Sequence, residues 1–259
     1  MTSATGAQPA FAAALERLRA VAVATRQLPA VMPNETPDVA ACRIRLSEGV
    51  AALAGERVID WPTLRANAAT LAAHVDATVI QEIARLADVM GGPALVEAAL
   101  AGELEASGAP HAAITLLDYA SRPALRAAAA QLREIIAESG WSRGTCPACA
   151  ALPLLAELHS SKGENARVLR CGRCETAWSM TRLACPACDE RDHTKLRYLH
   201  VEGEMEHRRA ECCTTCGFYL KAVATLDPLK DDALLDADLA TLALDTLAIE
   251  AGYHRRSGA

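Results

Sequence analysis

Eight of the ten cysteines in the chain fall into four Cys-x-x-Cys pairs, and these pairs constrain the fold more than any other feature. They lie within residues 146–216, and two of them sit in nearly identical hexapeptides, TCPACA and ACPACD. A spacer of 21 residues separates the first pair from the second, and one of 24 residues separates the third from the fourth. The sequence therefore contains a tandem repeat of a unit with four cysteines.

A Cys-x-x-Cys turn holds two sulfurs on one side of a tight loop. Two such turns that face each other present four thiolates near the corners of a tetrahedron, which suits Zn²⁺ or a single iron. Both spacers are long enough for a β-hairpin. We pair the turns sequentially, because the repeat argues against the alternative of interleaved pairing. The predicted metal ligands are Cys146, Cys149, Cys171 and Cys174 in one site, and Cys185, Cys188, Cys213 and Cys216 in the other.

Redox dithiols and disulfides are the alternative uses of such pairs. No basic start precedes the first apolar run of the chain, and charged residues interrupt that run, so no signal peptide is expected. No window holds 18 uncharged apolar residues, so no membrane insertion is expected either. We expect a cytoplasmic protein, and in a reducing compartment paired cysteines are more often metal ligands than structural disulfides.

The two remaining cysteines and the rest of the chain give little sign of catalysis. Cys42 lies in a helical pattern and is expected to be buried, whereas Cys212 is expected to point away from the site, with a substitute ligand as its alternative role. A closed site of four thiolates leaves no open position for water or substrate. No Ser/His/Asp arrangement, phosphate loop or carboxylate pair is evident. The chain is therefore predicted to be a binding or accessory protein and not an enzyme.

Residues 1–140 are predicted to form an α-helical domain. Aromatic residues make up only 3% of the chain, so its core must be built mostly from Ala, Leu and Val, a bias that favours helices. Pro93 follows a Gly-Gly stop and is expected in the first turn of a new helix. For a helix over residues 121–140, Ser121 is the candidate cap and Gly140 the terminator.

The remaining residues complete an α+β fold. Residues 141–224 contain short β-prone runs, namely LPLLAELH, ARVLR, TAWSM, KLRYLH and GFYLKAV, and predict a small β domain of hairpins built from two zinc-ribbon-like units of four cysteines. Residues 225–259 predict a C-terminal helix, which starts at Asp227-Pro228, and a basic tail.

The charge of the chain argues against a general nucleic-acid binder, since the formal net charge is −6 and the pI is near 5.7. Residues 141–224 are the one basic stretch, with 12 basic and 10 acidic side chains. A zinc-ribbon protein that binds nucleic acid therefore stays as an alternative, and its candidate contacts are Arg167, Arg170, Arg173 and Arg197.

Six stretches of residues 145–245 together carry a resemblance to a known family. They are CPAC, which occurs twice, LRCGRCETAW, LRYLHV, AECCTTCGFYLKAV and DLATLALD. In these stretches the chain resembles the formate dehydrogenase accessory protein (FdhE) family. The resemblance implies a helical domain followed by two rubredoxin-like units, with the eight paired cysteines as ligands of two metal ions, iron or alternatively zinc. It also implies a cytoplasmic chaperone that binds the immature catalytic subunit of formate dehydrogenase. A rubredoxin-like electron carrier is the alternative.

Rubredoxin-like turns often carry glycine after the second cysteine, where the backbone needs a positive φ. Here those positions hold Ala150, Glu175, Asp189 and Gly217, so the first three turns are expected to be slightly strained. Four side chains flank the last pair and are weak candidates for contact with an acidic client, with a solvated hairpin face as the alternative. They are Arg208, Arg209, Tyr219 and Lys221.

Overall fold

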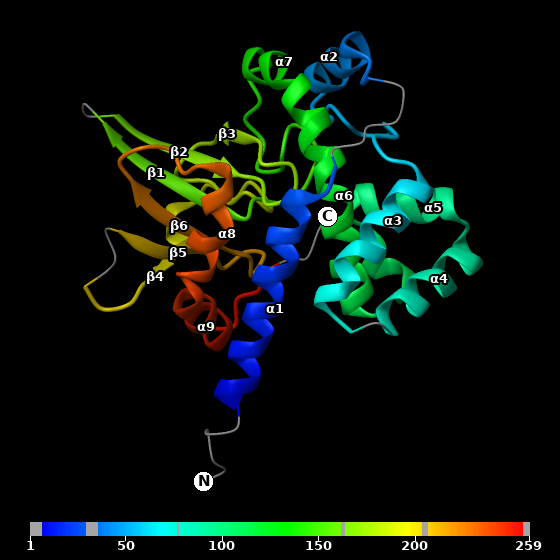
Figure 1. Cartoon of the computed structure of the whole chain (residues 1–259). Helices are drawn as coiled ribbons and strands as arrows, with labels where there is room; N and C mark the ends of the chain where they lie inside the picture. Colours follow the sequence, from blue (N-terminus) through cyan, green and yellow to red (C-terminus); the bar gives the residue numbers. More distant parts are fainter. Residues whose placement is uncertain (1–6, 30–35, 77, 162–163, 204–206, 256–259) are drawn as a thin grey trace. The chain divides into compact units, whose positions relative to one another are not determined.

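The computed structural model describes residues 7–29, 36–76, 78–161, 164–203 and 207–255 (Figure 1). The chain divides into two compact units. The first comprises Met1–Thr36 and Arg57–Ala127, and the second comprises Pro37–Glu56 and Ala128–Ala259. The second unit thus takes up a segment from the N-terminal third of the chain together with all eight paired cysteines. The domain boundaries that the sequence suggests, at residues 140 and 224, stay predictions.

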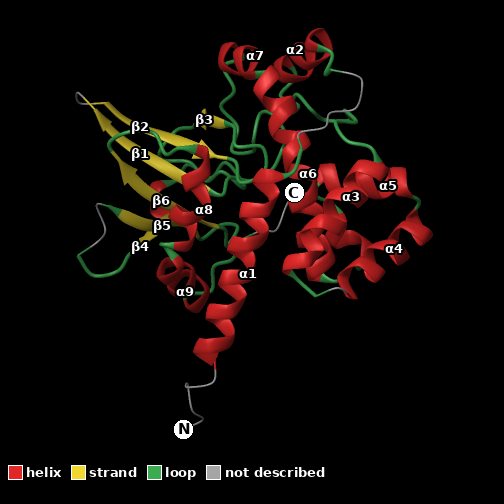
Figure 2. Ribbon diagram, viewed as in Figure 1, coloured by secondary structure: helices red, strands yellow, loops and turns green. Residues whose placement is uncertain are grey.

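The first unit is helical, as Figure 2 shows. It holds α1 (Ala7–Gln27), α3 (Trp61–Leu71), α4 (Thr78–Met90), α5 (Gly92–Ala101), the first part of α6 (His111–Gln131), and the 3-10 turns η1 (Ala72–His74) and η2 (Leu104–Ser107). Asp60 caps α3 by accepting a 2.8 Å hydrogen bond from the Thr63 amide. The stop between α4 and α5 is confirmed, because Gly91 has a φ of +84° and Pro93 lies in the first turn of α5. The core is aliphatic and includes Leu64, Leu71, Leu95, Leu116 and Leu117.

The predicted helix start at Ser121 is wrong, because α6 runs through it. The Ser121 hydroxyl donates back to the Asp118 carbonyl at 2.8 Å, and Arg122 pairs with the Asp118 carboxylate at 2.7 Å. Both contacts belong to a helix interior, and the buried Leu125 shows that packing outweighs the penalty of Pro123 inside the helix. The predicted terminator is confirmed, since Gly140 has a φ of +65°, but the stretch is not one helix: α6 ends at Gln131, and α7 (Arg133–Glu138) follows after Leu132.

The second unit contains α2 (Val39–Ser47), α7 and a sheet of six strands. The strands are β1 (Leu155–Ser161), β2 (Glu164–Arg170), β3 (Ala177–Ser179), β4 (Leu196–Leu199), β5 (Arg208–Cys213) and β6 (Tyr219–Thr225). Their order is β3-β2-β1-β6-β5-β4. Each cysteine repeat supplies one antiparallel half of the sheet, and the parallel pairing of β1 with β6, in which Leu155 lies opposite Lys221, joins the halves. The mixed helix-and-sheet fold is therefore confirmed, with both repeats sharing one sheet.

The C-terminal region forms helices that start later than predicted. The 3-10 turns are η3 (His193–Lys195), which precedes β4, and η4 (Asp231–Ala233), which leads into α8 (Leu234–Leu239) and α9 (Leu242–Glu250). A start at Asp227-Pro228 fails because Leu229 is held outside the helix: its amide donates to the buried Glu157 at 2.7 Å and its carbonyl accepts from Arg170 at 2.8 Å. Thr241 separates α8 from α9, since its backbone leaves the helical region at a φ of −113° and a ψ of 21°.

α9 packs on all three strands of the second repeat, β4, β5 and β6, through a small core of Ala210, Cys212, Tyr219, Leu244 and Ala248. None of the helices in the described ranges is long and apolar enough to cross a membrane.

Candidate metal centres

Two clusters of four cysteine sulfurs form in the second unit, each with its ligand atoms within 4.8 Å of one another. The sulfurs of Cys146 and Cys174 lie 3.4 Å apart, and those of Cys185 and Cys216 lie 3.7 Å apart. The structure thus brings the cysteines together in the sequential arrangement that the repeat indicates. The first cluster contains Cys146, Cys149, Cys171 and Cys174, and the second contains Cys185, Cys188, Cys213 and Cys216.

The four turns share one backbone design. In the first, third and fourth turns, the amide of the residue after the second cysteine donates to the carbonyl of the first cysteine, as from Ala150 to Cys146 at 3.0 Å and from Asp189 to Cys185 at 2.9 Å. In all four turns the first cysteine's own amide donates to a residue beyond the pair, as from Cys171 to the Thr176 carbonyl at 3.0 Å. These bonds close each loop so that both sulfurs point to the same side.

The predicted strain of the turns is confirmed. Among the described residues, the non-glycine positions with positive φ are Ala150 at 63°, Glu175 at 64° and Asp189 at 56°. Each directly follows the second cysteine of a pair, and the equivalent Gly217 has a φ of 73°. A left-handed conformation costs a residue with a Cβ roughly 1–2 kcal/mol, so the sequence tolerates this penalty in three turns out of four.

Backbone and side-chain donors surround the sulfurs of the first cluster. The amides of Arg173 and Cys174 point at the Cys171 sulfur from 3.4 and 3.5 Å. Hydrogen bonds from its cysteine neighbours lower the pKa of Cys171, whereas burial raises the pKa of Cys146 and Cys174. Cys171 is therefore favoured as the thiolate of this group. A metal ion that binds must displace the protons of the neutral thiols.

The second cluster follows the same pattern with more solvent around it. Burial raises the pKa of Cys185, and it raises the pKa of Cys188 to about 11. Burial also opposes ionisation of Cys213, but amide donors from Cys216 and Thr215 outweigh it and lower the pKa of Cys213. The donor set in both clusters, four soft sulfurs with backbone amides that donate to the sulfurs, fits a four-thiolate metal site.

Separate contacts hold the first cluster in place. The amides of Ala52 and Leu53 donate to the Pro147 and Ala148 carbonyls at 2.8 and 2.9 Å, so the segment 51–53 lies against the first turn. The indole of Trp178 donates to the Arg143 carbonyl at 3.0 Å. One set of contacts comes from the loop that follows α2, and the other comes from β3. Together they enclose the turns of the first cluster.

The second cluster is held by a smaller set of contacts. The Thr215 hydroxyl donates to Glu190 at 2.6 Å, which ties one turn to the other. On the other side, His254 pairs with the backbone of Gly217, since its amide donates to the Gly217 carbonyl at 2.8 Å. A Cβ at Gly217 would come within 2.7 Å of the His254 ring, so the tail lies close to this turn.

A cavity of about 20 Å³, room for about one water molecule, borders the second cluster. Its lining includes Cys185 and Cys213, the arginines Arg167, Arg182 and Arg197, and Glu211, which pairs with Arg167 at 2.7 Å. A divalent ion held by four thiolates would carry two negative charges, and Arg182 and Arg197 beside it would partly offset them. Of the candidate nucleic-acid contacts, Arg167 and Arg197 thus lie beside the second cluster, whereas Arg170 pairs with Glu157 and with Asp231 at 2.6 Å.

The four weak candidates for a client surface separate into two groups. Arg208 on β5 is exposed, and Arg209 beside it pairs with Glu211 at 2.9 Å and lies over the Tyr198 ring. Their role toward a client stays a prediction. Tyr219 and Lys221 are buried, at 2% and 0% exposure, so neither side chain is available to a client in this structure.

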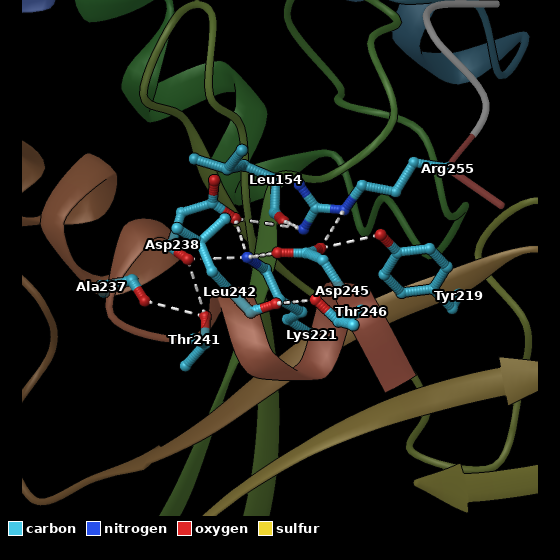
Figure 3. Close-up of polar contacts among 10 residues, drawn as sticks. All are labelled: Leu154, Tyr219, Lys221, Ala237, Asp238, Thr241, Leu242, Asp245, Thr246 and Arg255. Atoms are coloured by element: carbon cyan, nitrogen blue, oxygen red, sulfur yellow. Dashed lines mark hydrogen bonds and ion pairs between the residues drawn. The ribbon is translucent and has the colours of Figure 1, made fainter. Parts of the chain in front are cut away.

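Tyr219 and Lys221 belong instead to a polar cluster beneath α8 and α9 (Figure 3). The Lys221 ammonium contacts Asp238 at 2.8 Å and Asp245 at 2.6 Å, and the Tyr219 hydroxyl donates to Asp245 at 2.8 Å. Arg255 reaches Asp238 at 3.2 Å. This polar cluster fastens the C-terminal helices and the tail to β6.

The two remaining cysteines behave as the sequence indicates. Cys42 is buried, and its thiol donates to the Ala52 carbonyl at 3.2 Å. Cys212 is buried between β5 and α9 and lies outside the second cluster. Sequence reasoning missed Glu190 and Thr215, whose contact joins two turns 25 residues apart; a carboxylate after one pair and a threonine inside another were the available signals.

Comparisons with known proteins agree with one another. The family model described as "FdhE, central domain" matches residues 145–182, and "FdhE, C-terminal domain" matches residues 183–259. A protein named "Protein FdhE homolog" from Edwardsiella ictaluri is 37% identical over 169 residues, which are 63% of this chain and 52% of the relative. "Protein FdhE" from Escherichia coli O127:H6 is 33% identical over 203 residues, which are 71% of this chain and 64% of the relative.

A solved structure is similar as well. The crystal structure of the FdhE protein from Pseudomonas aeruginosa superimposes with a TM-score of 0.64 and 27% identity, over 93% of this chain and 84% of that one. The likeness therefore extends over the helical unit as well as over the cysteine repeats. The chain spans 52% of the length of the Edwardsiella relative and 64% of the length of the Escherichia relative.

Proposed function

Because the chain belongs to the FdhE family, whose central and C-terminal domains it carries, we propose that it is an accessory protein for the maturation of formate dehydrogenase. The observation that carries the proposal is the pair of four-cysteine clusters, which lie within the stretches that match the family. On this proposal the chain is not an enzyme, and it works in the cytoplasm on a client that has not yet been exported.

The eight cysteines hold two metal ions in this proposal, iron or alternatively zinc. Four thiolates occupy every position of a tetrahedral ion, so the bound ion supplies cross-linking, and in the case of iron also a redox couple. Supporting this role, each cluster joins turns that are far apart in the chain, and three of the four turns keep a strained backbone. The ions therefore stiffen the surface that the second unit presents.

The proposed partner is the catalytic subunit of formate dehydrogenase in its immature form. Arg208 supports an acidic contact area on the client, since it is exposed on β5, whereas Arg209 next to it points to the opposite face of the sheet and pairs with Glu211. Charged residues at such a rim steer association more than they add affinity. Of the four weak candidates, Arg208 alone is exposed in this structure.

The test is complementation of a bacterium that lacks its own FdhE homologue. The full chain is expected to restore formate-dependent dye reduction, and a tagged form is expected to retain the catalytic subunit. Cys171→Ser and Cys213→Ser, each at a buried ligand position, are expected to remove both effects. Cys212→Ala is the matched control, because it changes a buried cysteine outside the clusters. Full activity without the chain, or with both serine variants, would overturn the proposal.

A rubredoxin-like electron carrier is a second candidate, favoured by the exposure of Cys188 at the rim of the second cluster. Such a carrier needs a redox-active ion close to the surface, so that electrons reach an external partner. Iron-loaded protein would then show a reversible colour change on reduction with dithionite and reoxidation in air. Zinc as the ion found in purified protein would exclude this candidate.

A further inference from the structure

The two clusters differ in how far their sulfurs are shielded from solvent. All four cysteines of the first cluster are buried, with residue exposures of 7% or less. In the second cluster Cys185 and Cys213 are buried, but Cys188 is exposed and Cys216 is half-buried. The contrast holds at equivalent positions of the repeat, because Cys188 and Cys216 are the second cysteines of their turns, as Cys149 and Cys174 are in the first cluster.

The shielding of the first cluster has identifiable sources. The segment 51–53 is buried and donates two backbone hydrogen bonds to the turn that carries Cys149. Next to the other turn, the Thr176 hydroxyl lies 3.1 Å from the Cys174 sulfur. Opening this cluster therefore requires that a segment from another part of the chain moves away.

The second cluster is divided into a held side and an open side. On the held side, Cys185 and Cys213 are buried and border the arginine-lined cavity. On the open side, Cys188 and Cys216 come from opposite turns, and the bond between Thr215 and Glu190 that joins these turns is itself exposed. An incoming ligand can displace a thiolate only where it can approach it, and reactivity of a thiolate follows the same access.

We propose that the second cluster is the exchange site of the protein, where a metal ion enters and leaves through Cys188 and Cys216, and that the first cluster holds its ion permanently. The ligand class that this site accepts is a soft donor, a thiolate foremost, which replaces Cys188 or Cys216 on the metal. Cys185 and Cys213 stay bound during the exchange. The proposal rests on the metal binding proposed above.

The test uses the intact chain loaded with two zinc ions and exposed to excess EDTA. Native mass spectrometry counts the ions over time, and brief alkylation followed by peptide mapping reports which cysteines have been released. One ion is expected to leave about tenfold faster than the other, because the second cluster opens locally more readily than the first. The peptides with Cys188 and Cys216 are expected to be alkylated in that phase, with Cys149 and Cys174 still protected.

The variant Cys188→Ser is expected to remove the fast phase and to leave the slow phase unchanged. Its matched counterpart is Cys149→Ser; whether or not that variant folds, the peptide map of the unaltered chain already assigns the phases. Loss of both ions at one rate, or alkylation of the first cluster before the second, would overturn the exchange proposal alone. A chain that binds no zinc and no iron would overturn the proposed metal binding as well.

Discussion

The hydroxyl of Thr215 lies 2.6 Å from a carboxylate oxygen of Glu190, and this hydrogen bond joins the two turns of the second cluster. Glu190 also accepts from the Asp192 amide at 3.0 Å and from the Lys195 ammonium at 3.1 Å. These hydrogen bonds to the charged form, led by that of Thr215, lower the pKa of Glu190 to about 2. The carboxylate is therefore ionised at every pH at which the cluster can hold a metal, and it acts as a fixed acceptor between the turns.

Removal of this brace is predicted to loosen the second cluster without unfolding the chain. Thr215→Val deletes the donor at an exposed site, where substitutions typically change stability by about 0.5 kcal/mol or less. Zinc loss from the second cluster to EDTA is expected to become faster, and the first cluster is expected to keep its rate. Thr70→Val, which removes an exposed hydroxyl from α3, serves as the control. Unchanged zinc loss in Thr215→Val would show that the bond does not hold the turns together.

Metal affinity is predicted to rise with pH. Burial raises the pKa of Cys146, Cys174, Cys185 and Cys188, so these groups are neutral thiols at pH 7 when no metal is bound. Each bound ion must release the protons of its thiols, so higher pH favours the loaded form. Competition with a zinc-binding dye measures the zinc affinity at pH 6 and at pH 8. The zinc affinity of the dye itself is calibrated at both pH values. An affinity independent of pH would contradict the presence of neutral thiols in the metal-free chain.

Glycine is predicted to stabilise the three strained turns. Ala150→Gly and Asp189→Gly relieve a left-handed backbone, and after the entropic penalty of glycine the expected gain is up to about 1 kcal/mol each. Gly217→Ala is the opposite control, because its positive φ and the nearby His254 ring both disfavour a Cβ. Thermal unfolding of the zinc-loaded chain should therefore shift up for the first two variants and down for the third. A shift of the same sign in all three would refute the assignment of strain.

Loss of the buried ammonium beneath α8 and α9 is predicted to destabilise the second unit strongly. Lys221→Met leaves Asp238 and Asp245 without their central counter-charge, and breaking a buried ion pair costs roughly 3–5 kcal/mol. Arg208→Met, at an exposed position on β5, is the matched control and should change the free energy of unfolding little. Denaturant titration of both variants measures the difference. Equal stability of the two variants would mean that the polar cluster does not fasten the helices.

The sequence predicted the cysteine turns well because their chemistry is local. The spacing of each pair, the need for positive φ after the second cysteine and the pairing of neighbouring turns all follow from a few adjacent residues, as Ala150 and Asp189 illustrate. The β-prone runs likewise found five of the six strands. β5 was missed, because its sequence RRAECC has no apolar run and gains its strand from pairing with β6.

The errors arose where distant residues decide the local structure. Ser121 looks like a helix cap, but a packed interior carries α6 past it and past Pro123. Asp227-Pro228 looks like a helix start, but Glu157 and Arg170, from β1 and β2, hold Leu229 outside the helix. The parallel pairing of β1 with β6 has no local signature at all, and it turned two expected hairpin units into one sheet.

The pairing of β1 with β6 determines the order in which the two repeats can fold during synthesis on the ribosome. β1 ends at Ser161, whereas the strand that covers its free side begins at Tyr219. During synthesis from the N-terminus, the first repeat can close its own antiparallel strands, but one edge of β1 stays open until the second repeat has emerged. An exposed strand edge invites pairing with other chains. Release of the nascent chain between the two repeats would therefore yield a fragment prone to self-association, and completion of the second repeat protects the first.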